Sequence, residues 1–280
     1  MEILSVHNLS KHYEKFDLKD VSFALDEGFI MGFIGRNGAG KTTTLKSILR
    51  LVHPDAGQVT MFGLDYAANE LKCKQKIGFM LGGVNFYPKK KLRTLAEVTS
   101  RFYSQWDNVE YLRCLDRFDL DPEKKIDELS AGMRVKFSLA LALSHHAQLL
   151  ILDEPTSGLD PVSRDELLYL FQDIIEDGGH SILFSTHIIS DLEKCADFIT
   201  YIKDGEIISK TDKDSFLESY RLVSGTTEQL SASLKSKLIG LREYKFGFEG
   251  MIQSDDLAVA SGLDVTTATL ENIMIHIERE

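Results

Sequence analysis

The sequence predicts an α/β fold around a mainly parallel sheet, and three observations lead to this prediction. Apolar β-like runs alternate with amphipathic helical runs along most of the 280 residues, a pattern typical of parallel sheets that helices cover on both faces. The apolar run at residues 29–34 leads through a glycine-rich loop into a helical run. Before it, short β-like runs at residues 3–9 and 21–25 predict an antiparallel β edge.

The remaining elements of this core are predicted from their periodicity and from the residues that end them. A helix runs from Lys41 to about Val52, and a turn at residues 53–57 follows it. The pair Gly178-Gly179 ends another helix, as a left-handed C-cap would. The other expected strands are residues 58–62, 77–81, 149–152, 181–184, 198–202 and 206–209, and the other expected helices are residues 162–176 and 188–195.

Two regions depart from this alternation. Between about residues 90 and 147, apolar residues recur at helical spacing, which predicts a helical subdomain inserted into the core. We therefore expect one domain at residues 1–215, which contains this insertion, and a small C-terminal α+β appendage at residues 216–280. Within the tail, residues 212–220, 227–238 and 269–277 have helical patterns, and residues 246–252 indicate a hairpin.

The composition disfavours several classes of protein. The formal net charge of −11 argues against broad binding to DNA or RNA, so no nucleic-acid partner is expected. The cysteines Cys73, Cys114 and Cys195 lie far apart and have no metal-ligand spacing, which is typical of a chain in a reducing cytosol. No apolar run approaches the length of a membrane span, and the N-terminus lacks the pattern of a signal peptide.

The glycine-rich loop has the complete pattern G-x-x-x-x-G-K-T between a buried strand and a helix. Glycines let backbone N–H groups turn inward around phosphate oxygens, and the helix directs the positive end of its dipole at the same anion. Lys41 is expected to reach the β- and γ-phosphates, and the Thr42 hydroxyl to bind Mg²⁺. The motif therefore predicts a P-loop NTPase core rather than an ordinary turn. Its expected nucleotide-binding residues are Gly35, Arg36, Asn37, Gly38, Ala39, Gly40, Lys41, Thr42 and Thr43.

Two further segments have candidate chemistry. The strand at residues 149–152 ends in Asp153 and Glu154, at the same edge of a parallel sheet as the phosphate loop. Asp153 is then placed to hold Mg²⁺ through water and Glu154 to polarise the attacking water, whereas the alternative is two solvated acids. Ser130 begins a helix that includes Gly132, either as an ordinary cap or as a second anion site.

Together these motifs resemble the ATP-binding subunits of ATP-binding cassette (ABC) transporters. The resemblance covers roughly residues 1–215. It implies an ATP hydrolase that uses Mg²⁺, with Glu154, His187 and Lys41 as catalytic residues. The motifs that carry it are, in chain order, the phosphate loop, Leu-Ser-x-Gly-Met at residues 129–133, Ile-Leu-Asp-Glu-Pro at residues 151–155, Ser-Gly-Leu-Asp at residues 157–160, and His187.

The resemblance also implies roles for residues that their own patterns leave open. Tyr13 matches the aromatic residue that stacks on adenine, and its alternative is a half-buried strand tyrosine. Ser130 and Gly132 match the signature loop, which contacts the γ-phosphate of ATP held by a second subunit. Asp160 matches a loop at the interface between subunits, and His187 matches the histidine that touches the γ-phosphate. Two ATP molecules would then lie between two head-to-tail subunits, as a homodimer or a heterodimer.

The sequence departs from the family pattern after the strand at residues 77–81. The family has a glutamine there that contacts Mg²⁺ and the attacking water, in a loop that also leans on the membrane partner, but this chain has Gly82-Gly83. The role is then lost, taken by water, or moved to a neighbour such as Asn85. Ala131 in the signature is a milder change, because a methyl group still permits close approach of phosphate. The basic run at residues 88–93 is either a contact to the membrane partner or to anionic lipid, or a solvated loop.

The expected function is therefore an ATP-binding and ATP-hydrolysing subunit that powers a membrane transporter by ATP-driven dimerisation. Its expected partners are a separate transmembrane permease and a second ATP-binding subunit. Its expected location is cytoplasmic, on the inner face of the cell membrane. The form Leu-Ser-x-Gly-Met-Arg and the short tail resemble exporters more than importers. The alternative is a soluble ABC ATPase that is not coupled to transport.

Overall fold

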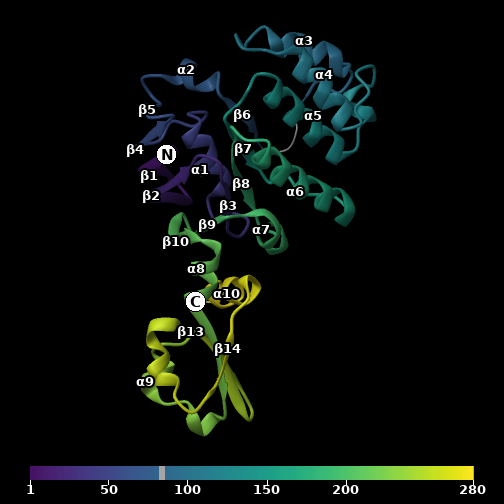
Figure 1. The fold of residues 1–280 in the computed structure, drawn as a ribbon. Coiled ribbons are helices and arrows are strands. Elements are labelled where there is room, and N and C mark those ends of the chain that lie inside the picture. Colours follow the sequence, from purple (N-terminus) through teal and green to yellow (C-terminus); the bar gives the residue numbers. More distant parts are fainter. Residues whose placement is uncertain (82–85, 280) are drawn as a thin grey trace. The chain divides into compact units, whose positions relative to one another are not determined.

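The computed structural model describes residues 1–81 and 86–279, which form two compact units, Met1–Lys210 and Thr211–Glu280 (Figure 1). The division falls ahead of residue 215, where the sequence analysis places the boundary, because α8 (Lys213–Glu218) packs on a strand of the second unit. Gly82, Gly83 and Asn85, which concern the missing glutamine, lie outside the described residues.

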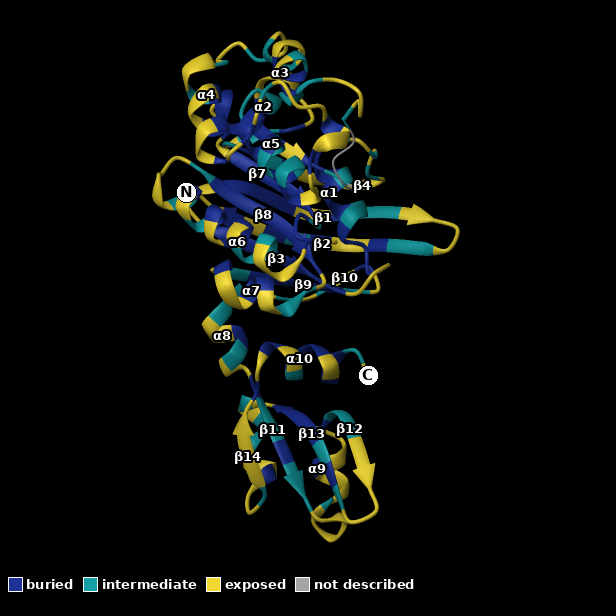
Figure 2. Ribbon diagram, turned by 90° about the vertical axis from the view of Figure 1, so that its right-hand side faces the viewer, coloured by how far each residue is buried: buried dark blue, intermediate teal, exposed yellow. Residues whose placement is uncertain are grey.

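A six-stranded sheet with the order β10-β9-β3-β8-β7-β6 forms the centre of the first unit. Its strands from β9 to β6 are parallel neighbours, so their carboxyl ends meet at one edge. Every residue of β3 (Ile30–Ile34), β7 (Leu149–Asp153) and β8 (Ser181–Thr186) is buried (Figure 2). The continuous apolar runs in the sequence are therefore the central strands. The other strands of this sheet are β6 (Ile77–Met80), β9 (Phe198–Lys203) and β10 (Glu206–Asp212).

Helices pack against this sheet. Helix α1 (Lys41–Ile48) packs on β7, and α6 (Pro161–Glu176) packs on β8. Helix α7 (Ile189–Cys195) lies so close to β3 that a methyl group at Gly32 would be 2.0 Å from Leu192 Cδ2. Any larger residue at this position would require at least the Leu192 side chain to move.

The expected antiparallel edge is a separate four-stranded sheet with the order β2-β1-β4-β5. Strand β1 (Glu2–Tyr13) pairs antiparallel with both β2 (Phe16–Asp26) and β4 (Ala56–Met61), and β4 also pairs with the short β5 (Leu64–Asp65). Buried side chains from this sheet, from β3 and from α1 form one apolar core. The α/β fold with a parallel core and antiparallel β structure is therefore confirmed.

Between residues 90 and 147 the chain is helical. Helix α4 (Asn108–Arg117) begins at Asp107, whose carboxylate accepts hydrogen bonds from two backbone N–H groups of the first turn. It packs on α5 (Ala131–Ser144), and α5 also contacts α3 (Leu92–Ser100) and β6. The short helix α2 (Glu70–Lys74) precedes β6 and was not expected from the sequence.

The second unit is a four-stranded antiparallel sheet with the order β12-β13-β11-β14. Residues 227–238 do not form one helix, because Ser231 caps the separate short helix α9 (Ala232–Lys235). Residues 246–252 belong mostly to one strand, β13 (Gly247–Gln253), and its hairpin partner is β12 (Ile239–Tyr244). The other elements are β11 (Tyr220–Gly225), β14 (Asp264–Thr267) and α10 (Leu270–Ile277).

In the described part of the chain, no helix has both the length and the apolar character that crossing a membrane requires.

Candidate functional site

The phosphate loop ends in two glycines with left-handed backbones. Gly38 has φ 90° and Gly40 has φ 113°, and α1 begins at the next residue, Lys41. The buried Lys41 ammonium group donates hydrogen bonds to the carbonyl oxygens of Gly35 (2.6 Å) and Arg36 (3.2 Å). Among the described residues no side chain caps the amino end of α1. The first N–H groups of this helix are therefore directed at the loop, as an anion site requires.

Asp153 lies at the carboxyl end of β7 and joins two strands to the phosphate loop. The Thr42 hydroxyl donates a hydrogen bond to Asp153 Oδ2 (2.8 Å), and the Ser185 hydroxyl of β8 donates one to Asp153 Oδ1 (2.6 Å). Thr42 and Asp153, the two expected Mg²⁺ ligands, are thus in direct contact. They are 111 residues apart in the sequence.

Glu154 follows Asp153 and lies between two nitrogen groups. Its Oε1 is 3.1 Å from the Lys41 ammonium nitrogen, and its Oε2 is 2.7 Å from His187 Nδ1. Its backbone is left-handed, with φ 51°, and its N–H donates to the carbonyl and hydroxyl oxygens of Ser185. A left-handed conformation of a residue other than glycine costs about 1–2 kcal/mol. The structure therefore brings together the three residues that the sequence analysis expects to be catalytic.

A pocket of about 590 Å³ opens beside this group. Tyr13 and Phe16, at the turn between β1 and β2, contribute its aromatic lining. Tyr13 is 41 % exposed, and Lys11 Nζ lies 5.8 Å from the centre of its ring. The remaining lining residues are Lys15, Arg36, Asn37, Gly38, Gly40, Lys41, Thr42, Thr43 and Glu154.

Ser130 and Gly132, which match the family signature, are not among the described residues that line this pocket. Ser130 is exposed, and its hydroxyl caps α5 by accepting a hydrogen bond from the Met133 N–H (3.2 Å). Gly132 is buried, and a methyl group there would meet Ser163 Cβ at an ordinary 3.6 Å. Packing within this chain therefore does not explain a glycine, which costs about 1 kcal/mol in a helix.

Asp160 has a complete local role as the N-cap of α6. Its carboxylate accepts hydrogen bonds from the Val162 and Ser163 N–H groups (3.0 Å each) and from the Ser163 hydroxyl (2.6 Å). The hydroxyl bond and then the N–H bonds hold the pKa of Asp160 below its usual range.

Two features of the site were not found from the sequence. Ser185 bonds Asp153 and the backbone of Glu154, and the signal for it was a hydroxyl at the carboxyl end of a buried strand. The turn between β9 and β10 contacts the phosphate loop, because the Gly205 N–H donates to the Ala39 carbonyl oxygen (3.0 Å). Asp204 and Gly205 have φ 48° and 81°, the type I′ pattern of a two-residue hairpin.

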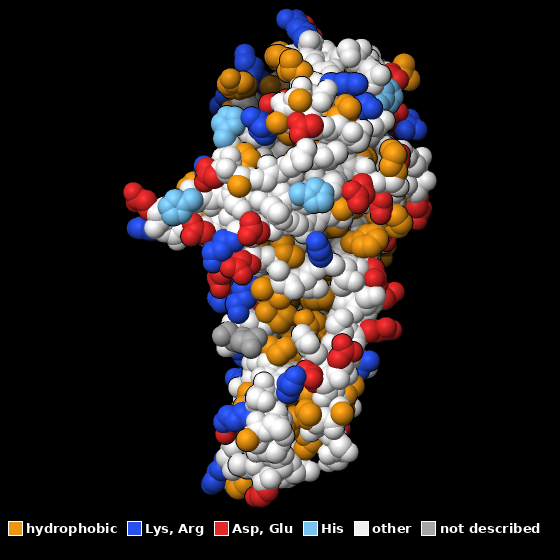
Figure 3. All heavy atoms as spheres, turned by 90° about the vertical axis from the view of Figure 1, so that its left-hand side faces the viewer, with side chains coloured by type: hydrophobic (Ala, Val, Ile, Leu, Met, Phe, Trp, Pro, Cys, Tyr) orange, Lys and Arg blue, Asp and Glu red, His pale blue; other side chains and the backbone are white. Residues whose placement is uncertain are grey.

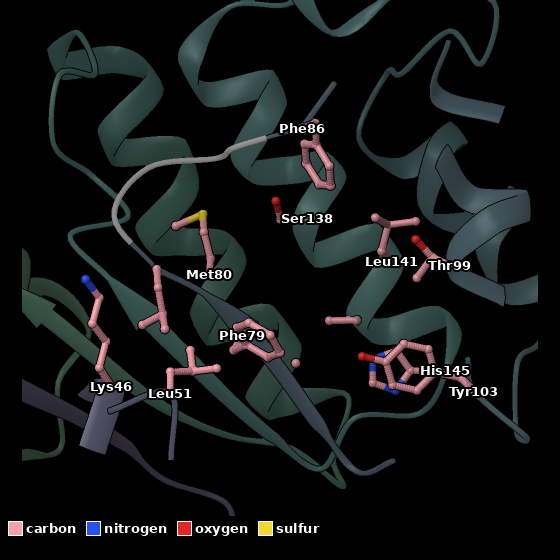
Figure 4. A pocket seen from close by; sticks show the side chains of 13 residues that line it. Lys46, Leu51, Phe79, Met80, Phe86, Thr99, Tyr103, Ser138, Leu141 and His145 are labelled. Carbon is pink, nitrogen blue, oxygen red and sulfur yellow. The ribbon is translucent and has the colours of Figure 1, made fainter. Parts of the chain in front are cut away.

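A second pocket, of about 400 Å³, lies beside β6, α1 and α5 (Figure 4). Phe79 and Leu141 give it an apolar lining, and Phe79 is 46 % exposed. The rings of Tyr103 and His145 stack in it, with centres 3.6 Å apart and an angle of 9° between their planes. Burial lowers the pKa of His145 to about 4.

The basic run at residues 88–93 is paired with acids of the helical segment. Lys89 bonds Asp127 at 2.7 Å, while Lys91 and Arg93 both contact Glu123, at 2.7 and 3.1 Å. Figure 3 likewise shows Lys and Arg side chains interspersed with Asp and Glu on one face of the molecule.

Several known proteins are similar to this chain in sequence or in fold. The family model for ABC transporters matches residues 18–157. The ABC transporter ATP-binding protein YtrB of Bacillus subtilis (strain 168) is 34 % identical to this chain over 203 residues, which cover 72 % of this chain and 69 % of that protein. The chain belongs to the ABC transporter family.

Other similar ABC proteins extend the comparison. The bacitracin transport ATP-binding protein BcrA of Bacillus licheniformis is 27 % identical over 284 residues, which cover 96 % of this chain and 93 % of that protein. The Nod factor export ATP-binding protein I of Burkholderia orbicola (strain AU 1054) is 31 % identical over 224 residues, or 77 % of this chain and 73 % of that protein. A solved dimer of the ATP-binding cassette MJ0796, in a post-hydrolysis state with ADP and Pi, has a TM-score of 0.65 and 25 % identity, and covers 75 % of this chain and 98 % of that one.

The family identifies the biochemical activity. This ABC subunit binds and hydrolyses ATP and powers a membrane transporter. The function and the enzyme class expected from the sequence are therefore confirmed.

Proposed function

We propose that ATP hydrolysis in this subunit uses Glu154 to polarise the attacking water. The observation that supports this role is the position of its carboxylate between Lys41 (3.1 Å) and His187 (2.7 Å) at the carboxyl edge of the parallel sheet. An ionised carboxylate only accepts hydrogen bonds, so it can take a proton from water once Lys41 turns to phosphate. His187 then contacts the γ-phosphate, and Lys41 the β- and γ-phosphates.

The nucleotide itself is proposed to occupy the 590 Å³ pocket. Adenine stacks on Tyr13, and the phosphates lie against the backbone N–H groups of the loop from Gly35 to Thr43. The left-handed backbones of Gly38 and Gly40 support this role, because they turn successive N–H groups toward one point.

Thr42 and Asp153 fit the requirements of Mg²⁺. Both offer oxygen ligands, the two oxygens are 2.8 Å apart, and Ser185 orients the carboxylate from its other side. Mg²⁺ prefers oxygen ligands and retains several waters, so one hydroxyl and one carboxylate suffice alongside phosphate. When bound, the ion would neutralise charge on the phosphates.

We further propose that a complete site needs two subunits. Ser130, Gly132 and Asp160 do not line the pocket of their own chain, and Ser130 is exposed at a helix N-terminus. In a head-to-tail dimer Ser130 and Gly132 would contact ATP held by the second subunit, and Asp160 would lie at the interface. Binding of ATP then favours the closed dimer, and hydrolysis reopens it.

A test of the catalytic proposal uses Glu154→Gln, which retains shape but removes the base. We expect it to bind ATP, to accumulate as a dimer with ATP in size-exclusion chromatography, and to lose turnover. Glu166→Gln, at an exposed acid paired with Lys136, is the matched control and should behave as the unmodified protein. Normal turnover in Glu154→Gln would refute the role of Glu154.

The partner is proposed to be a separate transmembrane permease, which holds this subunit at the cytoplasmic face of the membrane. The name of the Nod factor relative supports export as the direction of transport. The permease is proposed to contact the 400 Å³ pocket, because residues 81 and 86 of its lining flank the loop that leans on the membrane partner in this family.

Affinity purification from detergent-solubilised native membranes tests this partner. Recovery of a multi-span protein with the unmodified chain, its loss with Phe79→Ser and its retention with Phe246→Ser would support the proposal. Phe246 is a suitable control because it is 79 % exposed and lies in the second unit. Recovery of ribosomes or nucleic acid instead of a multi-span protein would overturn the proposed permease partner.

A further inference from the structure

We propose that Asp191 is a positioning residue for hydrolysis, because it joins the loop that carries Glu154 to the loop that carries His187. This inference rests on the proposed roles of Glu154 and His187. It concerns a side chain that touches neither of them and that would not contact the nucleotide.

One carboxylate oxygen makes the connection. Asp191 Oδ2 accepts a hydrogen bond from the Thr156 hydroxyl (2.6 Å) and another from the Thr186 hydroxyl (3.1 Å). Thr156 follows Glu154 after one intervening residue, and Thr186 directly precedes His187. The Thr186 hydroxyl also accepts a hydrogen bond from the Ile188 N–H group (3.0 Å). Thr186 therefore precedes His187 and also bonds the residue that follows it.

The cost of burying this carboxylate indicates a specific role. Asp191 is fully buried in the first turn of α7, and its Oδ1 has no hydrogen-bond partner among the described residues. Burial raises the pKa of Asp191, and the bonds from Thr156 and Thr186 oppose this rise. It does not cap the helix, since Ile188 holds that position without a side-chain bond. The charge of Arg164 also favours the ionised carboxylate. An apolar residue would avoid the desolvation cost but would make neither threonine bond.

The connection bears directly on the geometry of the site. Glu154 has a strained left-handed backbone, which persists only where surrounding contacts hold it. Its carboxylate must also stay within reach of His187, at 2.7 Å. Asp191 joins the two loops through Thr156 and Thr186. Its loss should therefore displace the catalytic groups while it leaves the phosphate loop intact.

Three substitutions separate positioning from simple stabilisation. Asp191→Asn keeps one acceptor oxygen for the threonines, and we expect its kcat to stay close to that of the unmodified protein. Asp191→Leu and Thr156→Val remove the bond, and we expect kcat to fall about 10- to 100-fold with little change in ATP affinity. Their effects should not add in the double variant, because both remove the same link. Thr200→Val, at a buried hydroxyl on β9, is the matched control and should retain kcat.

The measurements are steady-state ATPase activity, ATP binding by titration calorimetry, and thermal unfolding, with Glu154→Gln assayed alongside. If Asp191→Leu does not fold, Thr156→Val and Thr186→Val decide the matter, since neither buries a new charge. Unchanged kcat in the folded Leu and Val variants would overturn the role of Asp191. Additive losses of kcat in the double variant, or an equal loss in Thr200→Val, would do the same. Turnover retained by Glu154→Gln would instead overturn the proposed function on which the inference rests.

Discussion

Glu154 Oε2 lies 2.7 Å from His187 Nδ1, which joins the end of β7 to the residue after β8. This contact uses Nδ1, which leaves the other ring nitrogen, Nε2, directed away from Glu154. His187 is 40 % exposed at its side chain and Glu154 22 %. The more accessible partner is thus the one expected to reach phosphate.

Replacing His187 tests this arrangement. We expect His187→Ala to lower kcat about 100-fold, since it removes one group that stabilises transition-state charge, and to change ATP affinity much less. His7→Ala, at an exposed histidine of β1, serves as the control. Steady-state ATPase kinetics measure kcat, and titration calorimetry measures ATP affinity. A loss of affinity without a loss of kcat would contradict the role.

Replacing Lys41 should abolish nucleotide binding rather than turnover alone. Its ammonium group bonds the carbonyl oxygens of Gly35 and Arg36 and contacts Glu154, so Lys41→Ala removes both the loop closure and the cation for phosphate. We expect the binding free energy of ATP to weaken by about 3 kcal/mol or more. Titration calorimetry checks this, with Lys46→Ala on the same helix as control. Equal affinity in the two variants would refute the prediction.

The glycine at the β9–β10 turn should be indispensable. Gly205 has φ 81°, and a methyl group there would lie 1.8 Å from the Asp17 carbonyl oxygen. Gly178 has φ 83° but nothing within 4 Å. Gly178→Ala should therefore cost only about 1–2 kcal/mol of unfolding free energy from backbone strain. Gly205→Ala should cost more unfolding free energy, because the turn must move away from Asp17. This movement should also weaken ATP binding, because it displaces the N–H group that bonds Ala39 of the phosphate loop.

Urea unfolding of both glycine variants measures these free energies. Equal destabilisation would show that the close approach to Asp17 does not matter.

Burial of His145 should make stability depend on pH. Its pKa falls to about 4 in the folded protein, against about 6.5 when unfolded, so the unfolded chain binds the proton more readily between these values. Stability is then full above about pH 6.5 and is lost as pH falls toward 4, by about 2 kcal/mol at pH 5. His145→Phe keeps the stack on Tyr103 and should reduce this loss, whereas His146→Asn, at an exposed neighbour, should not.

Thermal unfolding at pH 7.5 and pH 5 distinguishes the two histidine variants. The same pH dependence in His145→Phe as in the unmodified protein would contradict this account.

Local patterns in the sequence determined most elements of the first unit and much of the site. The continuous apolar runs of β3, β7 and β8 are typical of strands buried on both faces, and the structure has them there. The glycine and lysine spacing of the phosphate loop specifies its own turn, because Gly38 and Gly40 must adopt left-handed backbones next to Lys41. Asp153 ends its strand and Glu154 follows it, so their place at the sheet edge follows from parallel pairing alone.

Only the tertiary structure decided which of these elements meet. Strand β3 lies between β8 and β9, far along the chain, and Tyr13 reaches the 590 Å³ pocket through a hairpin of β1 and β2. The bond from Thr156 to Asp191 spans 35 residues, and neither residue belongs to a motif that spacing reveals. Periodicity reports what each residue does within its own helix or strand. Contacts between distant segments depend instead on how the side chains of the whole core pack.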